Sequence, residues 1–310
     1  MGLADKLRHF AVHFQPVHMI SPLGIERICL REFRYFIRRH RRYLITFLAI
    51  YGYSLFAWRR LRLLRAGHCL AQHVDDVLDG DRAVGIPPLN YLDELIGKIE
   101  ANHFDFASDI PALAGFVFGE ADRRLRPGCD IRTEFLALFK TLRADRVRFE
   151  SQSLLTKEQL DALHRATFTH SMDVSLMMVD SPLRAADIPE MVGALSWVSP
   201  MRDLREDLQR GLVNVPLEVI EAAREAGATS LAYDALMATR AVRAWVRAEF
   251  QRGEACLQAI PPRLRQLFPR RGVLEIWAFY VEIARYAVRY KTRYHGICNW
   301  GLDTPEALVE

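Results

Sequence analysis

The stretch that decides the fold reads Asp75-Asp76-Val77-Leu78-Asp79 and is followed by Gly80. Residues 67–79 contain no proline and no internal glycine, which predicts the end of a helix with Gly80 just beyond it. Asp79 lies four residues after Asp75 and three after Asp76, so on a helix the three carboxylates crowd one side of a single turn. Like charges at that spacing destabilise a helix, and the cluster therefore indicates a bound cation.

A second acidic cluster follows far along the chain, after Pro200. Asp203 and Asp207 are again four residues apart, and Arg210 lies three residues beyond Asp207. The regular pattern up to Gly211 predicts a helix that carries the carboxylates and a guanidinium on one face. The alternative for either cluster alone is a solvated acidic helix end, because a short motif is only a hypothesis.

Two acidic helix turns that face each other would hold metal ions between them. Carboxylate oxygens suit a hard cation such as Mg²⁺, with Mn²⁺ as an alternative, and such an ion completes its shell with waters and phosphate oxygens. We therefore predict a metal site formed by Asp75, Asp79, Asp203 and Asp207, with Asp76 as a further member of the catalytic cluster. Arginine would add bidentate contacts to the oxygens of a diphosphate.

The two clusters together resemble the two aspartate-rich motifs of the squalene/phytoene synthase family. The second motif carries most of the resemblance, because Arg202-Asp203, Asp207, Arg210-Gly211 and Pro216-Leu217-Glu218 stand at the family spacing. Between the motifs, Leu142-Arg143-Ala144-Asp145 and Thr156-Lys157-Glu158-Gln159-Leu160 resemble the middle helix and the start of the next one. The resemblance covers about residues 65–220.

This resemblance implies an all-α, single-domain helical bundle around a central apolar cavity. It also implies head-to-head condensation of two prenyl diphosphates, farnesyl or geranylgeranyl, to a product of the squalene, hydroxysqualene or phytoene type. The metals would act as Lewis acids on the leaving diphosphate, and Arg202 and Arg210 would lie near it. Arg62 and Arg65 lie within three turns of Asp75 and are further candidates for diphosphate binding.

The chain departs from the family pattern at several positions. Leu212 and Asn214 stand where the family usually has Arg and Tyr, and Ser196 and Ser199 stand where it usually has Gln and Asn. The tyrosines that handle protons in the helix after the flap are replaced by Leu163, His164 and Arg165. His164 and His170 are candidate substitutes in proton transfer, although a lone histidine on such a helix is more often a core residue.

Composition sets the wider limits. Half of the 310 residues are hydrophobic and no linker divides the chain, so we predict one domain over 1–310, with 1–24 peripheral to the core. The net charge of +4 is too small to indicate nucleic-acid binding. Five cysteines without a Cys-x-x-Cys pair predict free thiols. The first residues lack a secretory apolar core, which favours the cytoplasm. The oligomeric state stays open.

The rest of the chain shows helical periodicity and no strand-like alternation. We predict helices over about 5–14, 25–65, 90–103, 110–125, 131–150, 157–179, 187–210, 216–226, 229–256 and 273–294. Residues 43–58 carry no charge and have arginines on both sides. They are too short to span a membrane, and we interpret them as a core helix or as a helix at a membrane surface.

Smaller features leave alternatives open. Met172, Met177 and Met178 could line a tunnel for a prenyl chain or belong to the core. His9 and His13 have metal-ligand spacing without an evident third ligand, so no metal is predicted there. NADPH use is undecided, since the sequence has no dinucleotide fingerprint.

Two other functions compete with the prenyltransferase. A class I terpene cyclase needs the same metals and a single prenyl diphosphate, but its usual second motif is not visible at residues 203–207. A non-catalytic lipid-binding or assembly protein would explain the lost arginine and tyrosine. It would not explain why all five motif aspartates are present, because a scaffold has no need for repelling carboxylates.

Overall fold

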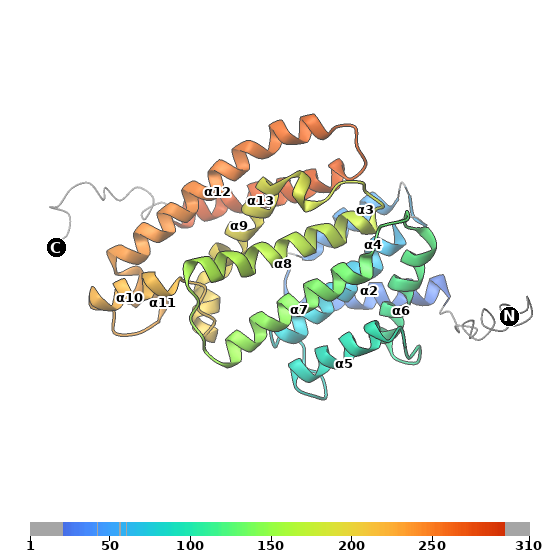
Figure 1. The fold of residues 1–310 in the computed structure, drawn as a ribbon, viewed down its shortest axis with the longest axis horizontal. Coiled ribbons are helices and arrows are strands. Elements are labelled where there is room, and N and C mark those ends of the chain that lie inside the picture. The colour runs from blue at the N-terminus through green and yellow to red at the C-terminus, as the bar shows by residue number, and fades with distance from the viewer. Residues whose placement is uncertain (1–20, 42, 56, 60, 295–310) are drawn as a thin grey trace, which may run out of the picture.

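Each regular element in the part of the chain that the structure describes is a helix, and the helices pack into one body (Figure 1). The structure is a computed structural model that describes residues 21–41, 43–55, 57–59 and 61–294. The first half holds α2 (Pro22–Arg39), α3 (Tyr43–Ser54), α4 (Arg62–Leu78), α5 (Pro88–Glu100), α6 (Asp109–Arg124) and α7 (Ile131–Glu150). The second half holds α8 (Lys157–Met178), α9 (Pro189–Arg210), α10 (Leu217–Glu225), α11 (Tyr233–Met237), α12 (Arg240–Leu267) and α13 (Val273–Arg293). The predicted all-α class is confirmed.

The ends of the two helices that carry the aspartates follow from local sequence. Gly80 and Gly211 have left-handed backbone angles, φ 77° and φ 88°, which side chains with a Cβ rarely adopt. They end α4 and α9 directly after the motifs. At the start of α8, Thr156 and Gln159 form a capping box in which each side chain accepts from the backbone N–H of the other residue.

The buried apolar residues form two clusters that meet along α8. The first cluster is built mainly from α2, α4, α5, α6 and α7, and the second from α9, α10, α12 and α13. Helix α8 belongs to both, because Met177 and Met178 lie in the first cluster and Met172 in the second. In Figure 1, α8 runs between α7 on one side and α9 with α12 on the other. The methionines are therefore core residues in this structure.

Two glycines permit the closest helix contacts. A Cβ on Gly67 of α4 would overlap the sulfur of Met178 on α8, and a Cβ on Gly253 of α12 would overlap the indole of Trp197 on α9. Both neighbours are buried, so neither can move aside without disturbing the core. Glycine at these positions brings α4 and α9, the two motif helices, into their places.

Most of the predicted helices have the observed boundaries within two residues, and 131–150 agrees at both ends. Two predictions are wrong. The region 25–65 is not one helix: His40 is extended, and α2, α3 and α4 are separate. The region 229–256 divides into α11 and α12, and α12 then continues through Pro261 and Pro262. The predicted helix 5–14, with His9 and His13, lies outside the described residues.

Within the described ranges, none of the helices has the length and hydropathy that crossing a bilayer requires. The four cysteines described, Cys29, Cys69, Cys129 and Cys256, are free thiols as predicted, and Cys298 lies outside the described residues.

Candidate functional site

The C-terminal ends of α4 and α9 come together. Arg210 is the last residue of α9, and its Nη2 lies 3.5 Å from Oδ1 of Asp81, which follows α4 directly after Gly80. The Asp81 side chain is largely buried, with 9% of its surface exposed. This contact joins segments about 130 residues apart in sequence and brings the motif carboxylates of one helix near those of the other.

The first motif holds its carboxylates in a partly buried setting. Gln72, one turn earlier on α4, donates from its amide nitrogen to Asp75 at 3.1 Å and to Asp76 at 2.8 Å. Asp76 is buried, and its Oδ2 has no hydrogen-bond partner among the described residues. Burial raises the pKa of Asp76 above its ordinary value, and the bond from Gln72 offsets only part of this effect. A buried carboxylate oxygen without a donor is a position that a cation would stabilise.

The carboxylates of the two motifs act on each other electrostatically. Burial raises the pKa of Asp79 to about 8, and the charges of Asp75, Asp81, Asp207 and Asp145 add to the increase. Burial also raises the pKa of Asp207 to about 7, with further contributions from Asp203 and Asp145. Repelling carboxylates from α4, α7 and α9 therefore surround a common region. Asp145 belongs to the stretch that resembles the family but was not among the predicted metal ligands.

The second motif is compensated by donors of the chain itself. Arg202 binds Asp203 through Nε, at 2.8 Å and 2.9 Å from its two oxygens. The amide nitrogen of Asn214 donates to Oδ2 of Asp207 at 2.8 Å. The amide oxygen of Asn214 accepts from Arg148 at 2.7 Å, and Arg148 also donates to Asp145 at 2.8 Å. Asn214, at the position where the family usually has Tyr, thus links α9 to α7.

Arg39 of α2 and His40, which follows it, also reach this region, and the predicted site did not include them. Nη2 of Arg39 donates to Asp81 at 2.8 Å, and Nε2 of His40 lies 3.1 Å from the other oxygen of Asp81. Burial alone would raise the pKa of Asp81, but the bonds from Arg39 and His40 outweigh it and hold this pKa below its ordinary value. The basic run around His40 was the available signal, since such a run can face an anion as well as solvent.

The four predicted diphosphate-binding arginines have different surroundings. Arg202 and Arg210 lie at the aspartates, as described above. Arg65 is fully buried, makes a bidentate ion pair with Glu26 at 2.9 to 3.2 Å, and stacks over the ring of Trp58. These contacts place its guanidinium against α2 and not at the motif carboxylates, which corrects the prediction for Arg65. The Nε of Arg62 is buried without a hydrogen-bond partner in the described part of the chain.

A buried polar group supports the loop after the first motif. Nη1 of Arg82 donates to Oε2 of Glu32 at 2.6 Å, and Nδ1 of His73 lies 2.9 Å from the same oxygen. The hydroxyl of Tyr91 lies 3.0 Å from Nε2 of His73. The backbone N–H of Arg82 donates to the carbonyl of Asp76 at 2.9 Å. Glu32, His73 and Arg82 therefore fix the backbone that carries Asp76 and Asp79, and no sequence motif had indicated them.

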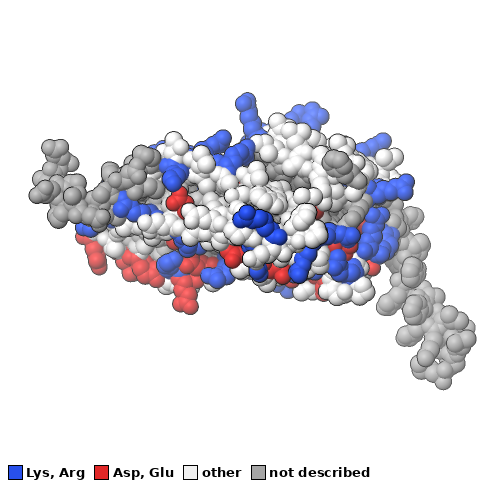
Figure 2. Space-filling view, turned by 90° about the horizontal axis from the view of Figure 1, so that it is seen from above, with Lys and Arg blue, Asp and Glu red and all other residues white. Residues whose placement is uncertain are grey.

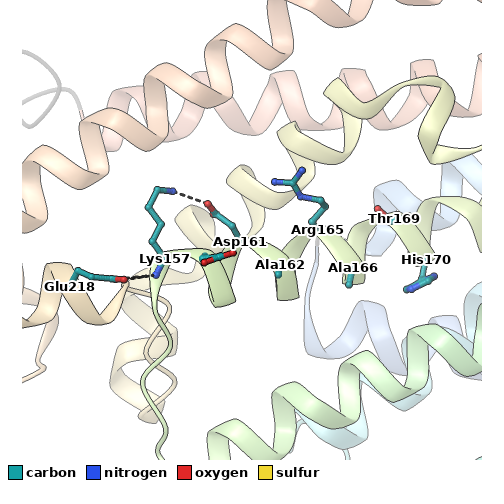
Figure 3. Close-up of a pocket in the computed structure, with 9 residues that line it drawn as sticks. Lys157, Asp161, Ala162, Arg165, Ala166, Thr169, His170 and Glu218 are labelled. Atoms are coloured by element: carbon teal, nitrogen blue, oxygen red, sulfur yellow. Dashed lines mark hydrogen bonds and ion pairs between the residues drawn. The ribbon is translucent and has the colours of Figure 1, made fainter.

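Two cavities lie beside α8, and the motif aspartates line neither of them. The larger, about 780 Å³, follows one face of α8 from Lys157 to His170 and reaches Glu218 of α10 (Figure 3). In it, His170 is paired with Glu134 at 2.9 Å. The smaller, about 20 Å³, is lined by His164, Ser196 and Asn214 among others. Such a volume holds about one water molecule and not a prenyl chain. Burial, followed by the charge of Arg148, lowers the pKa of His164 to about 4, so it is neutral near pH 7.

The donor chemistry of the motif region fits a hard divalent cation. Within the described ranges, no three His, Cys, Asp or Glu side chains are placed to hold one ion by themselves. Mg²⁺ usually takes only one or two carboxylates and fills its shell with water and substrate phosphate. The unpartnered oxygen of Asp76 and the mutual repulsion at Asp79 and Asp207 are consistent with such a partial shell.

Comparisons with known proteins found no match for this chain among family models, curated proteins or solved structures. The resemblance to the squalene/phytoene synthases thus stays a prediction from the motifs.

Proposed function

We propose that the protein is a Mg²⁺-dependent prenyltransferase that condenses two prenyl diphosphates head to head, as a divergent relative of the squalene/phytoene synthases. The observation that carries the proposal is the meeting of the two aspartate-bearing helix ends, where Arg210 contacts Asp81 and the charge of Asp207 adds to the raised pKa of Asp79. Keeping repelling carboxylates close together and largely buried costs stability, so a function that needs them is the simplest explanation.

The residues around the site suit an allylic diphosphate. Arg210 and Arg39 meet at Asp81, beside the motif carboxylates, where a diphosphate could exchange for the carboxylate as their partner. When bound, a divalent cation would neutralise charge on the leaving diphosphate. The buried apolar side chains of α8 and α9 would keep water from the carbocation.

The small cavity favours a second candidate, a non-catalytic protein with the same fold. The space beside His164 and Ser196 is about 20 Å³, and a prenyl chain would need α8 and α9 to separate. For the prenyltransferase, this separation must accompany substrate binding. For the non-catalytic protein, it would not occur.

The deciding experiment is incubation of the purified protein and Mg²⁺ with farnesyl or geranylgeranyl diphosphate, followed by mass spectrometry of the organic extract. A hydrocarbon or alcohol with twice the carbon number of the substrate is the expected result. A product with the carbon number of the substrate would instead indicate a terpene cyclase or simple ionisation. No turnover would favour the non-catalytic candidate.

Matched variants connect any product to the site. Asp75→Asn should abolish turnover without loss of helical content. Asp122→Asn makes the same chemical change on an exposed part of α6 and should leave turnover unchanged. If Asp75→Asn were as active as Asp122→Asn, the motif aspartates would not form the catalytic site.

A further inference from the structure

Helix α3 is apolar on both of its sides although it lies at the surface. Its inner side packs through Phe47 and Tyr51 onto Phe33 of α2. Its outer side exposes Leu44, Ile45 and Leu48, and Leu48 has 59% of its surface exposed. A helix that is apolar all round belongs inside a core or against an apolar medium. The outer side of α3 has no part of the described protein to cover it.

The apolar surface continues onto α13. The hydroxyl of Tyr53 donates to Glu275 at 2.7 Å and joins the end of α3 to the start of α13. Leu55, 77% exposed, and Leu274, 63% exposed, lie beside this link. Two more exposed side chains, Val281 and Val288, follow Leu274 at intervals of seven residues and so lie on one side of α13. We name these exposed residues of α3 and α13, with Leu55, the α3–α13 surface.

The chain on both sides of α3 carries positive charges. Arg38 and Arg41 precede it and Arg59 follows it, and all three are exposed. The sequence contains no Asp or Glu from residue 33 to residue 74. Seen from above, the protein gathers its acidic residues along the lower edge of the view, whereas the upper edge shows Lys and Arg among uncharged residues (Figure 2).

We propose that the α3–α13 surface docks on a membrane that contains anionic lipids. The leucines of α3 enter the boundary between headgroups and acyl chains, and Arg38, Arg41 and Arg59 bind lipid phosphates at its two ends. A second copy of the chain fits less well, because a symmetric contact would bring arginine ends against arginine ends. The proposal does not depend on the proposed enzymatic function.

The test is cosedimentation of the purified full-length protein with vesicles. One set contains phosphatidylcholine alone, and the other contains equal amounts of phosphatidylcholine and phosphatidylglycerol. We expect binding to the mixed vesicles that is weaker at high salt, and much weaker binding to phosphatidylcholine alone. No binding of the wild-type protein to either set would overturn the proposal.

Two double variants separate the apolar contribution to vesicle binding from the electrostatic contribution. The double variant Leu48→Gln, Leu55→Gln should bind at least about tenfold more weakly, because two apolar side chains no longer enter the lipid. The double variant Arg41→Gln, Arg59→Gln should lose about tenfold on mixed vesicles and little on phosphatidylcholine. Controls with the same chemistry elsewhere are Val147→Gln and Arg224→Gln, both exposed in the structure. All these side chains are exposed, so the variants should fold.

Two results would overturn the membrane assignment. One is wild-type vesicle binding in the leucine variant. The other is size-exclusion chromatography that shows an oligomer of the wild-type protein which the leucine variant loses, because the α3–α13 surface would then be a contact between copies of the chain.

Discussion

The ends of α4 and α9 carry carboxylates at the same spacing but neutralise them differently. On α9, Arg202 pairs with Asp203 and Asn214 donates to Asp207. On α4, Gln72 is a shared neutral donor to Asp75 and Asp76, and one oxygen of Asp76 has no hydrogen-bond partner in the described part of the chain. If the proposed cation binds, we therefore expect the first motif to depend on it more than the second. Four predictions test this difference, beginning with the largest effect.

Loss of one carboxylate from either end should reduce Mg²⁺-dependent turnover by at least about 100-fold, because even residues that only support metal ligands contribute tenfold to 100-fold. Asp79→Asn and Asp207→Asn are the matched pair, measured by product formation and by circular dichroism. We expect Asp79→Asn to need more Mg²⁺ for half-maximal residual activity. An equal Mg²⁺ requirement would show that both ends depend on the cation alike.

Without metal, Asp79→Asn should be more stable than the wild-type protein at alkaline pH. The folded pKa of Asp79 is raised to about 8, above an ordinary aspartate value near 4, so the folded state binds this proton more tightly than the unfolded state. Wild-type stability therefore falls, relative to the variant, as pH rises from about 4 to about 8. Urea unfolding in a chelator should show a gap on the order of a few kcal/mol near pH 8 that narrows toward about pH 5. A gap independent of pH would contradict the raised pKa.

Removing the side-chain amide donors should lower the free energy of unfolding by different amounts at the two helix ends. Asn214→Ala takes a partner from both Asp207 and the buried Arg148, and we expect a loss of about 2 kcal/mol. Gln72→Ala takes a neutral donor from Asp75 and Asp76 and leaves no buried arginine without a partner, so we expect a loss of about 1 kcal/mol. Urea unfolding near pH 7 measures both. A larger loss of stability in Gln72→Ala than in Asn214→Ala would contradict the expectation that the second motif relies more on donors of the chain itself.

The smallest effect is expected in the larger cavity on α8. His170 and Glu134 form a pair there in which both side chains are partly exposed to solvent, and such pairs contribute little to stability. His170→Ala should change stability by less than about 1 kcal/mol and turnover by less than about twofold. A large loss of turnover with intact stability would make this cavity, and not the helix ends, the place where substrate binds.

The sequence predicted features that depend on local order. The helix ends at Gly80 and Gly211 and most of the helical ranges follow from residues a few positions apart, and the structure confirms them. The sequence could not predict which side chains become partners through tertiary packing. Arg65 has the spacing of a diphosphate ligand but lies against Glu26, and Asp81 became the meeting point of Arg39 and Arg210. A periodic pattern also could not show the break at His40, because arginine and histidine suit a helix and a connection equally.

The position of α8 in both apolar clusters has a consequence for folding during synthesis. The first cluster is made almost entirely of residues before 140, yet Val174, Met177 and Met178 of α8 complete it. The emerging N-terminal half therefore exposes an unfinished apolar face until the ribosome has released α8. From then on, α8 presents Met172 and Leu176 as the first members of the second cluster. One helix thus closes the first half of the molecule and provides the template on which the second half assembles.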